Sequence, residues 1–417
     1  MKRIENVELD DLVRQLNAEE TEGEPTGDGE HVGASAGVAV SPAAESRLCA
    51  PFDVPADLAT HLRRWFDGPA TDVHLIPREA PRIRVDGELQ RVGDGSPSHR
   101  LDPAVLEAWL LAPLDRARRD QLDASGAVDL SAELAPEGAD ASRFRFRVHI
   151  HRLGGSVAAS VRRLPTRIPD FAALHLPSAL VDVLRPMQGL VLVCGPTGSG
   201  KSTTLAAMLR WINENRAVHV LTLEDPVEYR HPQEKALIRQ LEIGVDTPSF
   251  AHGLRAALRQ DPDVILLGEM RDLESIEAAL QAAETGHLVL STVHTSDSAQ
   301  AIQRVVDVFP EGTREQARQL LASGLNSIVC QRLLPRIGGG VVPAVEILRA
   351  THPVRHHIRS GAAHKLYNEL VLGRRVGMVT LEQSLAELVE RQEIRLEDAL
   401  VRSTRPEELE SLVGGTA

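Results

Sequence analysis

The feature that most constrains the fold is a glycine-rich turn that directly follows an apolar run. The run covers residues 190–194, and residues 195–203 then have the form GxxxxGK[ST] with one further threonine. Apolar residues recur at helical spacing after this turn. A strand, a glycine-rich turn and a helix in this order predict a phosphate-binding loop, because the backbone N–H groups of such a turn curl around phosphate oxygens. The phosphate-binding residues expected from this motif are Gly195, Pro196, Thr197, Gly198, Ser199, Gly200, Lys201, Ser202 and Thr203.

Three more apolar runs follow at the spacing of an α/β fold. They cover residues 219–223, 264–267 and 288–292, and helical or loop segments separate them. Strands that are apolar on both faces predict a mostly parallel sheet with helices on both sides. Ligands of such a sheet bind at the carboxyl ends of its strands. After Pro310 we expect a largely helical chain to the C-terminus.

Acidic residues stand at the expected carboxyl ends of these strands. Glu224 and Glu228 follow the second run, and Glu269 follows the third. Hydrolysis of ATP needs Mg²⁺ near the β- and γ-phosphates, a carboxylate that orients or deprotonates water, and positive charge on the transition state. We therefore expect ATP and Mg²⁺ as cofactors, with Lys201 on the phosphates and with Ser202 and Glu269 near the metal. Either Glu224 or Glu228 is a candidate for holding the attacking water.

Two histidines and the same glutamates also have plainer structural interpretations. His294 follows the fourth run and is placed to contact the γ-phosphate, while His287 precedes that run and is a candidate for coupling it to a neighbouring subunit. Both are alternatively structural histidines. Glu269 is alternatively a helix cap, and Glu224 and Glu228 are alternatively turn residues solvated at the surface.

The length and composition of the chain predict several domains. The chain has 417 residues, and a single core usually splits beyond roughly 250–300 residues. The expected divisions are a disordered leader at 1–50, a mixed α/β domain at 51–164, a proline-marked linker at 165–177, an ATP-binding core at 178–345 and a helical region at 346–417. A net charge of −13 and an aromatic content of 3% argue against a nucleic-acid groove. No apolar targeting segment is present at the start, so a cytoplasmic location is expected.

The N-terminal region carries arginines in two of its expected strands. Apart from a possible short helix over 7–16 in the leader, we expect a helix with Leu58, Leu62 and Trp65 on one face, a strand over 71–77, a second over 82–89 closed by an Asp-Gly turn, a helix over 103–111 and a third strand over 143–150. Arg84 lies in the second of these strands and Arg147 in the third. Alternation at period two predicts arginines on the wet face of a half-buried strand, or arginines that reach a phosphate on a neighbouring subunit.

Four motifs in order resemble those of the secretion ATPases of type II secretion and type IV pili. They are the phosphate-binding loop at 195–203, the Asp box LEDPVEY at 223–229, a Walker B segment at 259–272 and a His box at 286–295. The resemblance covers the chain from about Pro51 to the C-terminus and is strongest for the pilus-retraction members. It does not extend to the leader.

This resemblance implies a homohexameric ring at the cytoplasmic face of the inner membrane, where ATP turnover drives an inner-membrane platform protein. Each subunit would have a PAS-like N-terminal domain and a RecA-like core with ATP between them. Glu228 matches the catalytic Asp-box glutamate and Glu269 the Walker B glutamate. His287 and His294 match the His-box histidines. Arg84 and Arg147 lie in strands that match the arginine-bearing ones.

The direction of the motor is expected from the C-terminal part. Extension and type II secretion members commonly carry a four-cysteine zinc insertion before the C-terminal helices, whereas Cys330 stands alone here. Residues 377–385 resemble the end of retraction members. The retraction motif at 353–360 keeps Arg355, Ile358 and Arg359 but is otherwise altered. A retraction motor is therefore expected; the alternatives are an extension or type II secretion ATPase, a catalytically weak accessory subunit and, disfavoured by charge, a nucleic-acid translocase.

Overall fold

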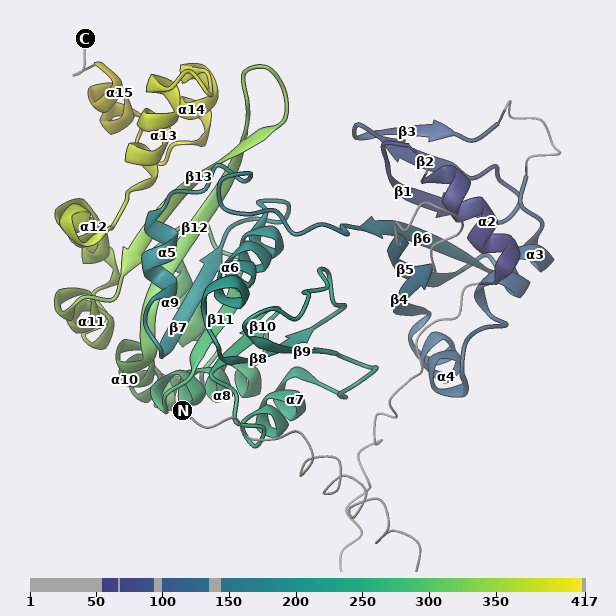
Figure 1. The fold of residues 1–417 in the computed structure, drawn as a ribbon, viewed down its shortest axis with the longest axis horizontal. Coiled ribbons are helices and arrows are strands. Elements are labelled where there is room, and N and C mark those ends of the chain that lie inside the picture. Colours follow the sequence, from purple (N-terminus) through teal and green to yellow (C-terminus); the bar gives the residue numbers. More distant parts are fainter. Residues whose placement is uncertain (1–54, 67, 94–99, 135–143, 415–417) are drawn as a thin grey trace, which may run out of the picture. The chain divides into compact units, whose positions relative to one another are not determined.

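The computed structural model describes residues 55–66, 68–93, 100–134 and 144–414, which form two sheets with their helices (Figure 1). The expected leader, including the helix expected over 7–16, lies outside the described residues. Residues 165–178 carry neither helix nor strand. None of the described helices is both long enough and apolar enough to cross a membrane.

The N-terminal sheet is antiparallel throughout, with the order β3-β2-β1-β6-β5-β4. Its strands are β1 (Ala70–Leu75), β2 (Arg82–Val85), β3 (Glu88–Arg91), β4 (Ala127–Leu134), β5 (Phe144–Leu153) and β6 (Ser156–Leu164), and its helices are α2 (Ala56–Trp65), α3 (Pro103–Leu110) and α4 (Arg116–Ser125). The Asp-Gly turn expected in the 82–89 segment is confirmed: Asp86 and Gly87 take positive φ angles of 49° and 87° and reverse the chain, so the segment forms the β2–β3 hairpin. Phe66 and Phe146 meet in the core with ring centroids 4.9 Å apart.

The larger sheet has the order β13-β12-β7-β11-β10-β8-β9 and is parallel except for the β12–β13 pair. Its strands are β7 (Gly189–Cys194), β8 (His219–Glu224), β9 (Leu237–Glu242), β10 (Val264–Leu267), β11 (Leu288–Val293), β12 (Leu325–Pro335) and β13 (Val341–Arg349). The four expected strands and the α/β class are confirmed. Most described residues after Pro310 are helical, as expected, but the expectation missed β12 and β13, which extend the sheet beside β7. The boundary expected at 345/346 falls inside β13.

Strand β7 is buried on both faces, which explains its unbroken apolar run. Leu190, Leu192 and Cys194 point into a core formed with α7 to α10, and Val191 and Val193 point into a second core formed with α5 and α6. These helices are α5 (Ala179–Leu184), α6 (Lys201–Asn215), α7 (Phe250–Ala257), α8 (Leu273–Glu284), α9 (Ser298–Asp307) and α10 (Arg314–Gly324), and η2 (Glu311–Thr313) precedes the last of them.

Helices follow β13 to the end of the described chain. They are α11 (His352–Arg359), η3 (Ala363–Lys365), α12 (Leu366–Leu372), η4 (Gly373–Val376), α13 (Leu381–Glu390), α14 (Leu396–Arg402) and α15 (Pro406–Gly414). Glu382 on α13 is fully buried, and its Oε1 accepts hydrogen bonds from the Thr404 and Arg405 backbone N–H groups at 3.1 Å and from the Ser403 and Thr404 hydroxyls at 3.0 Å. One carboxylate thus ties α13 to the turn that begins α15.

Substituting Glu382→Ala removes the acceptor of these four part-buried donors and should cost about 2–4 kcal/mol of local stability, because hydrogen bonds to a charged acceptor are among the stronger ones. Hydrogen exchange of the α14 and α15 amides should become faster while exchange in β7 stays unchanged. Glu387→Ala is the matched control, since Glu387 lies on the same helix with 54% of its side chain exposed. Equal exchange in the two variants would show that Glu382 does not hold this turn.

Candidate nucleotide site

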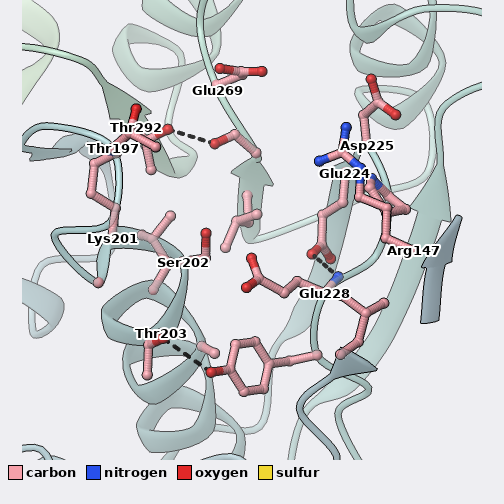
Figure 2. Close-up of a pocket in the computed structure, with 18 of the residues that line it drawn as sticks. Arg147, Thr197, Lys201, Ser202, Thr203, Glu224, Asp225, Glu228, Glu269 and Thr292 are labelled. Carbon is pink, nitrogen blue, oxygen red and sulfur yellow. Dashed lines mark hydrogen bonds between the residues drawn. The ribbon is translucent and has the colours of Figure 1, made fainter. Parts of the chain in front are cut away.

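A pocket of about 710 Å³ lies at the carboxyl ends of β7, β8, β10 and β11 (Figure 2). Its polar lining includes, from the glycine-rich turn, Thr197, Lys201, Ser202 and Thr203; from the strand ends and the loops after them, Glu224, Asp225, Glu228, Tyr229, His231, Glu269, Arg271, Thr292 and His294; and from the N-terminal sheet, Arg147 and Arg162. The turn and the acidic strand ends that the sequence singled out therefore share one cavity.

Glycine is required at two places in the turn. A Cβ atom on Gly195 would lie 2.4 Å from the Ser199 hydroxyl and 2.5 Å from the Gln331 carbonyl oxygen. Gly200 has a φ of 85°, and a Cβ there would lie 2.9 Å from the Gln331 amide nitrogen. Gln331, on β12, donates to the Ser199 carbonyl at 2.7 Å and accepts from the Thr204 hydroxyl at 2.7 Å. Strand β12 thus holds the turn in place.

Lys201 supplies a buried cation at the first turn of α6. Its side-chain nitrogen donates to the Gly195 carbonyl at 2.9 Å and the Pro196 carbonyl at 3.0 Å, and burial lowers the pKa of the ammonium. The Ser199 hydroxyl is buried without a hydrogen-bond partner in the described structure. A buried ammonium, an unpaired hydroxyl and the glycine turn together fit the phosphates of a nucleotide. The hydroxyl of Ser202 and the carboxylate of Glu269 in the same pocket are the oxygen ligands that Mg²⁺ prefers.

The two glutamates of the Asp box have different hydrogen-bond surroundings. The carboxylate of Glu224 accepts from the Thr222 hydroxyl at 2.7 Å, the Gln240 amide at 3.1 Å and the Glu228 backbone N–H at 3.4 Å. Burial raises the pKa of Glu224. The carboxylate of Glu228 accepts no hydrogen bond from any described residue, and Figure 2 shows it directed toward Ser202. Glu228 is therefore the glutamate that is free to contact water in the pocket.

Glu269 lies among cationic groups. Its carboxylate is paired with the Arg271 guanidinium and lies 3.5 Å from the His294 ring nitrogen Nε2, and the other ring nitrogen of His294 lies 3.5 Å from the Lys201 ammonium. The Thr292 hydroxyl donates to the Gly268 carbonyl at 2.7 Å and holds the strand end before Glu269. His294 thus lies between the Glu269 carboxylate and the Lys201 ammonium.

The structure does not bring Arg84 or His287 to this pocket. The Arg84 guanidinium donates to the Gly87 carbonyl at 2.6 Å in the β2–β3 turn. His287 precedes β11, at the amino end of the strand, and its Nδ1 lies 3.0 Å from the Ala282 carbonyl. Arg147 does line the pocket, where its guanidinium also lies 3.2 Å from Asp129.

Three residues that shape the site were missed from the sequence. Arg162 faces Arg147 across the β5–β6 pair and lines the pocket with it. Arg145 was expected on the wet face of its strand but is 5% exposed, because its guanidinium bonds the Asp-box backbone. Gln331 lies in a strand that was expected to be helical. The sequence did contain a signal for Arg162, because it lies beside a second arginine in an alternating strand. Neither Arg145 nor Gln331 has a feature in its local sequence that would predict its contacts.

Comparisons with known proteins agree with this geometry. Residues 173–411 match the model of a family described as type II/IV secretion system protein. The type IV pilus retraction ATPase PilT of Pseudomonas aeruginosa is 40% identical over 81% of this chain and 95% of its own length. A crystal structure of the pilus retraction motor PilT with bound ADP superposes with a TM-score of 0.75 at 41% identity, over 85% of this chain and 98% of that one. A putative type II secretion system protein E of Escherichia coli K12 is 48% identical but covers only 64% of this chain and 52% of its own length.

The matches extend over both sheets, and the family model alone spans more than half of the chain. The phosphate-binding turn, Asp box, Walker B segment and His box all fall within the matched residues. The chain therefore belongs to the type II/IV secretion system protein family.

Proposed function

We propose that this chain is a motor ATPase that hydrolyses ATP to power type IV pilus retraction, and hence twitching motility. The observation that carries the proposal is the single pocket in which Lys201, Ser202, Glu228 and Glu269 meet, in a chain that matches a pilus retraction ATPase over 95% of that protein's length. Such an enzyme would bind ATP and Mg²⁺.

The residues divide the chemistry between them. Lys201 and the turn N–H groups would bind the β- and γ-phosphates. Ser202 and Glu269 would hold Mg²⁺, which neutralises charge on the phosphate oxygens. Glu228 would accept a proton from the attacking water. The water oxygen would bond to the γ-phosphorus while the bond between that phosphorus and the leaving oxygen of ADP breaks. Arg147 would supply positive charge to the transition state, and Arg162, which faces it on β6, would add to that charge.

We propose the following organisation for the working motor. Residues 51–164 would form a PAS-like domain, and residues 165–177 would form a linker. Residues 178–345, together with the rest of β13, would form a RecA-like core, and the helices after β13 would complete it. Six copies would form a ring at the cytoplasmic face of the inner membrane and act on a platform protein there. Arg84 and His287, which lie outside the pocket of their own chain, would contact a neighbouring subunit.

Two observations favour retraction over extension or type II secretion. Strands β12 and β13 are joined by residues 336–340 alone, which leaves no room for a four-cysteine insertion. The chain also covers 52% of the type II secretion relative but nearly all of the retraction relative. An extension or type II secretion ATPase remains the second candidate because that relative is 48% identical in the shared part.

The altered retraction motif at 353–360 keeps two residues that contact the rest of the core, Arg355 and Ile358. The Arg355 guanidinium donates to the Ala322 carbonyl and, at 2.7 Å, to the Ser323 carbonyl, and so caps the end of α10. Ile358 is 1% exposed in the core. These two residues would support coupling to the pilus by holding α11 on α10. Of the changed positions, Pro353, His356 and Ser360 are exposed, whereas Val354 is buried and His357 is half-buried.

The Lys201→Ala variant should lose ATP turnover and most of its nucleotide affinity, because the cation that binds the phosphates is removed from a pocket. Nucleotide binding by titration calorimetry and phosphate release measure the two effects. Lys235→Ala, at an exposed position, is the control and should behave like the wild type. Near-normal turnover in Lys201→Ala would disprove the phosphate-binding role.

The Glu228→Gln variant should keep nucleotide binding while turnover falls by roughly 10²-fold or more, because the amide keeps the size of the side chain but cannot accept the proton. Glu234→Gln, an exposed glutamate nearby in the chain, should retain full turnover. Should binding and turnover fall together in Glu228→Gln, Glu228 would have a structural role instead.

A strain that lacks this protein should keep its surface pili, or carry more of them, and should fail to retract them. Fluorescence imaging of labelled pili measures both properties, and complementation with the Lys201→Ala variant should not restore retraction. Bald cells would reverse the assignment in favour of extension.

A further inference from the structure

We propose that Arg145 is a positioning residue for Glu228, and that the N-terminal sheet sets the orientation of Glu228 through it. The inference rests on the proposed role of Glu228 in activating water. It concerns a residue that does not itself line the pocket and acts through the backbone of one that does.

Arg145 holds two consecutive peptide carbonyls of the Asp box. Its Nη2 donates to the Val227 carbonyl at 2.5 Å and its Nη1 to the Glu228 carbonyl at 2.9 Å. The side chain is 5% exposed, and burial lowers the pKa of the guanidinium. A planar guanidinium that donates in two directions fixes the plane of the group it binds, as a flexible ammonium does not.

A second contact from the same sheet holds the other side of the Val227 peptide. The Ser131 hydroxyl on β4 donates to Glu242 Oε1 at 2.5 Å, and Glu242 Oε2 accepts from the Val227 backbone N–H at 3.1 Å. Glu242 is 6% exposed, so both bonds lie away from water. Val227 therefore has its N–H held through Ser131 and its carbonyl held by Arg145.

The far side of the Asp box is tied to the phosphate-binding helix. The Tyr229 hydroxyl lies 3.0 Å from the Thr203 hydroxyl on α6. The backbone of residues 227–229 is thus held from both directions, whereas the Glu228 carboxylate accepts no hydrogen bond from the described residues. Its direction is then set by the backbone, and Arg145 is the cation that fixes that backbone.

The same face of the sheet also lines the pocket. Ser131 pairs with Arg147 in the β4–β5 register, Arg147 pairs with Arg162 in the β5–β6 register, and Arg145 lies two residues before Arg147 on the same face. A shift of this sheet against the core would move the arginines of the pocket and the glutamate backbone together. Chemistry would then be possible only when the sheet is seated on the Asp box.

The test uses Arg145→Met, which keeps the length of the side chain and removes its donors. The kcat for ATP hydrolysis should fall by about tenfold to a hundredfold, since a misplacement near 1 Å carries a penalty of that size. Nucleotide affinity should change by less than about threefold, because the phosphate contacts remain. Arg145→Lys should recover part of the loss. Arg152→Met is the control, on the same strand and paired with Asp123 at the surface.

A double mutant separates positioning from folding. In the Glu228→Gln background, Arg145→Met should cause no further fall in single-turnover rate, because the group that it positions has already been replaced. Should Arg145→Met yield no folded ring, Ser131→Ala replaces it in both backgrounds, with an expected fall of about threefold to tenfold. The inference would be overturned by a wild-type kcat in Arg145→Met, or in Ser131→Ala where that variant replaces it. Equal losses of rate in the wild-type and Glu228→Gln backgrounds would also overturn it. A wild-type protein without ATPase activity would instead overturn the proposed function.

Discussion

The structure depends on the burial of β7 between two apolar layers. Alternate side chains of residues 190–194 enter the two cores, so the strand can shift neither along its axis nor about it without exposing apolar surface or opening a cavity. The glycine turn begins where this strand ends, and Gln331 on the neighbouring strand holds its other side. A loop without regular structure thereby acquires the rigidity of the sheet, which is what phosphate binding by backbone groups requires.

Strands that are apolar on both faces could be predicted from the sequence, because a run such as 264–267 has no polar position that suits solvent. Strand β12 could not, since Asn326, Gln331 and Arg332 interrupt its apolar residues and the burial of Gln331 depends on the turn it supports. The glycine-rich turn between β7 and α6 could be predicted from the spacing of its residues alone. The burial of Arg145 did not, because period-two alternation places an arginine toward water unless another segment supplies acceptors.

The two Asp-box glutamates have the same side chain but different hydrogen-bond partners, and these partners decide which carboxylate faces the pocket. The Glu224 carboxylate accepts hydrogen bonds from the Thr222 hydroxyl on its own strand and from the Gln240 amide. Glu228 has only its backbone held and presents its carboxylate to the pocket. Neither assignment can be made from residue type, because it depends on which donors from β9 and β5 reach the turn.

The bridge through Glu242 has a consequence for how this protein tolerates substitution. Loss of Ser131 would leave one carboxylate oxygen of Glu242 without its donor, and loss of Glu242 would strand the Val227 N–H in a buried position. Arg145 would in turn be an unpaired buried charge if the Asp-box backbone moved. Ser131 and Arg145 lie on paired strands of the N-terminal sheet and Glu242 lies in the larger sheet, so a substitution at any one of them changes the hydrogen bonds that the other two can make.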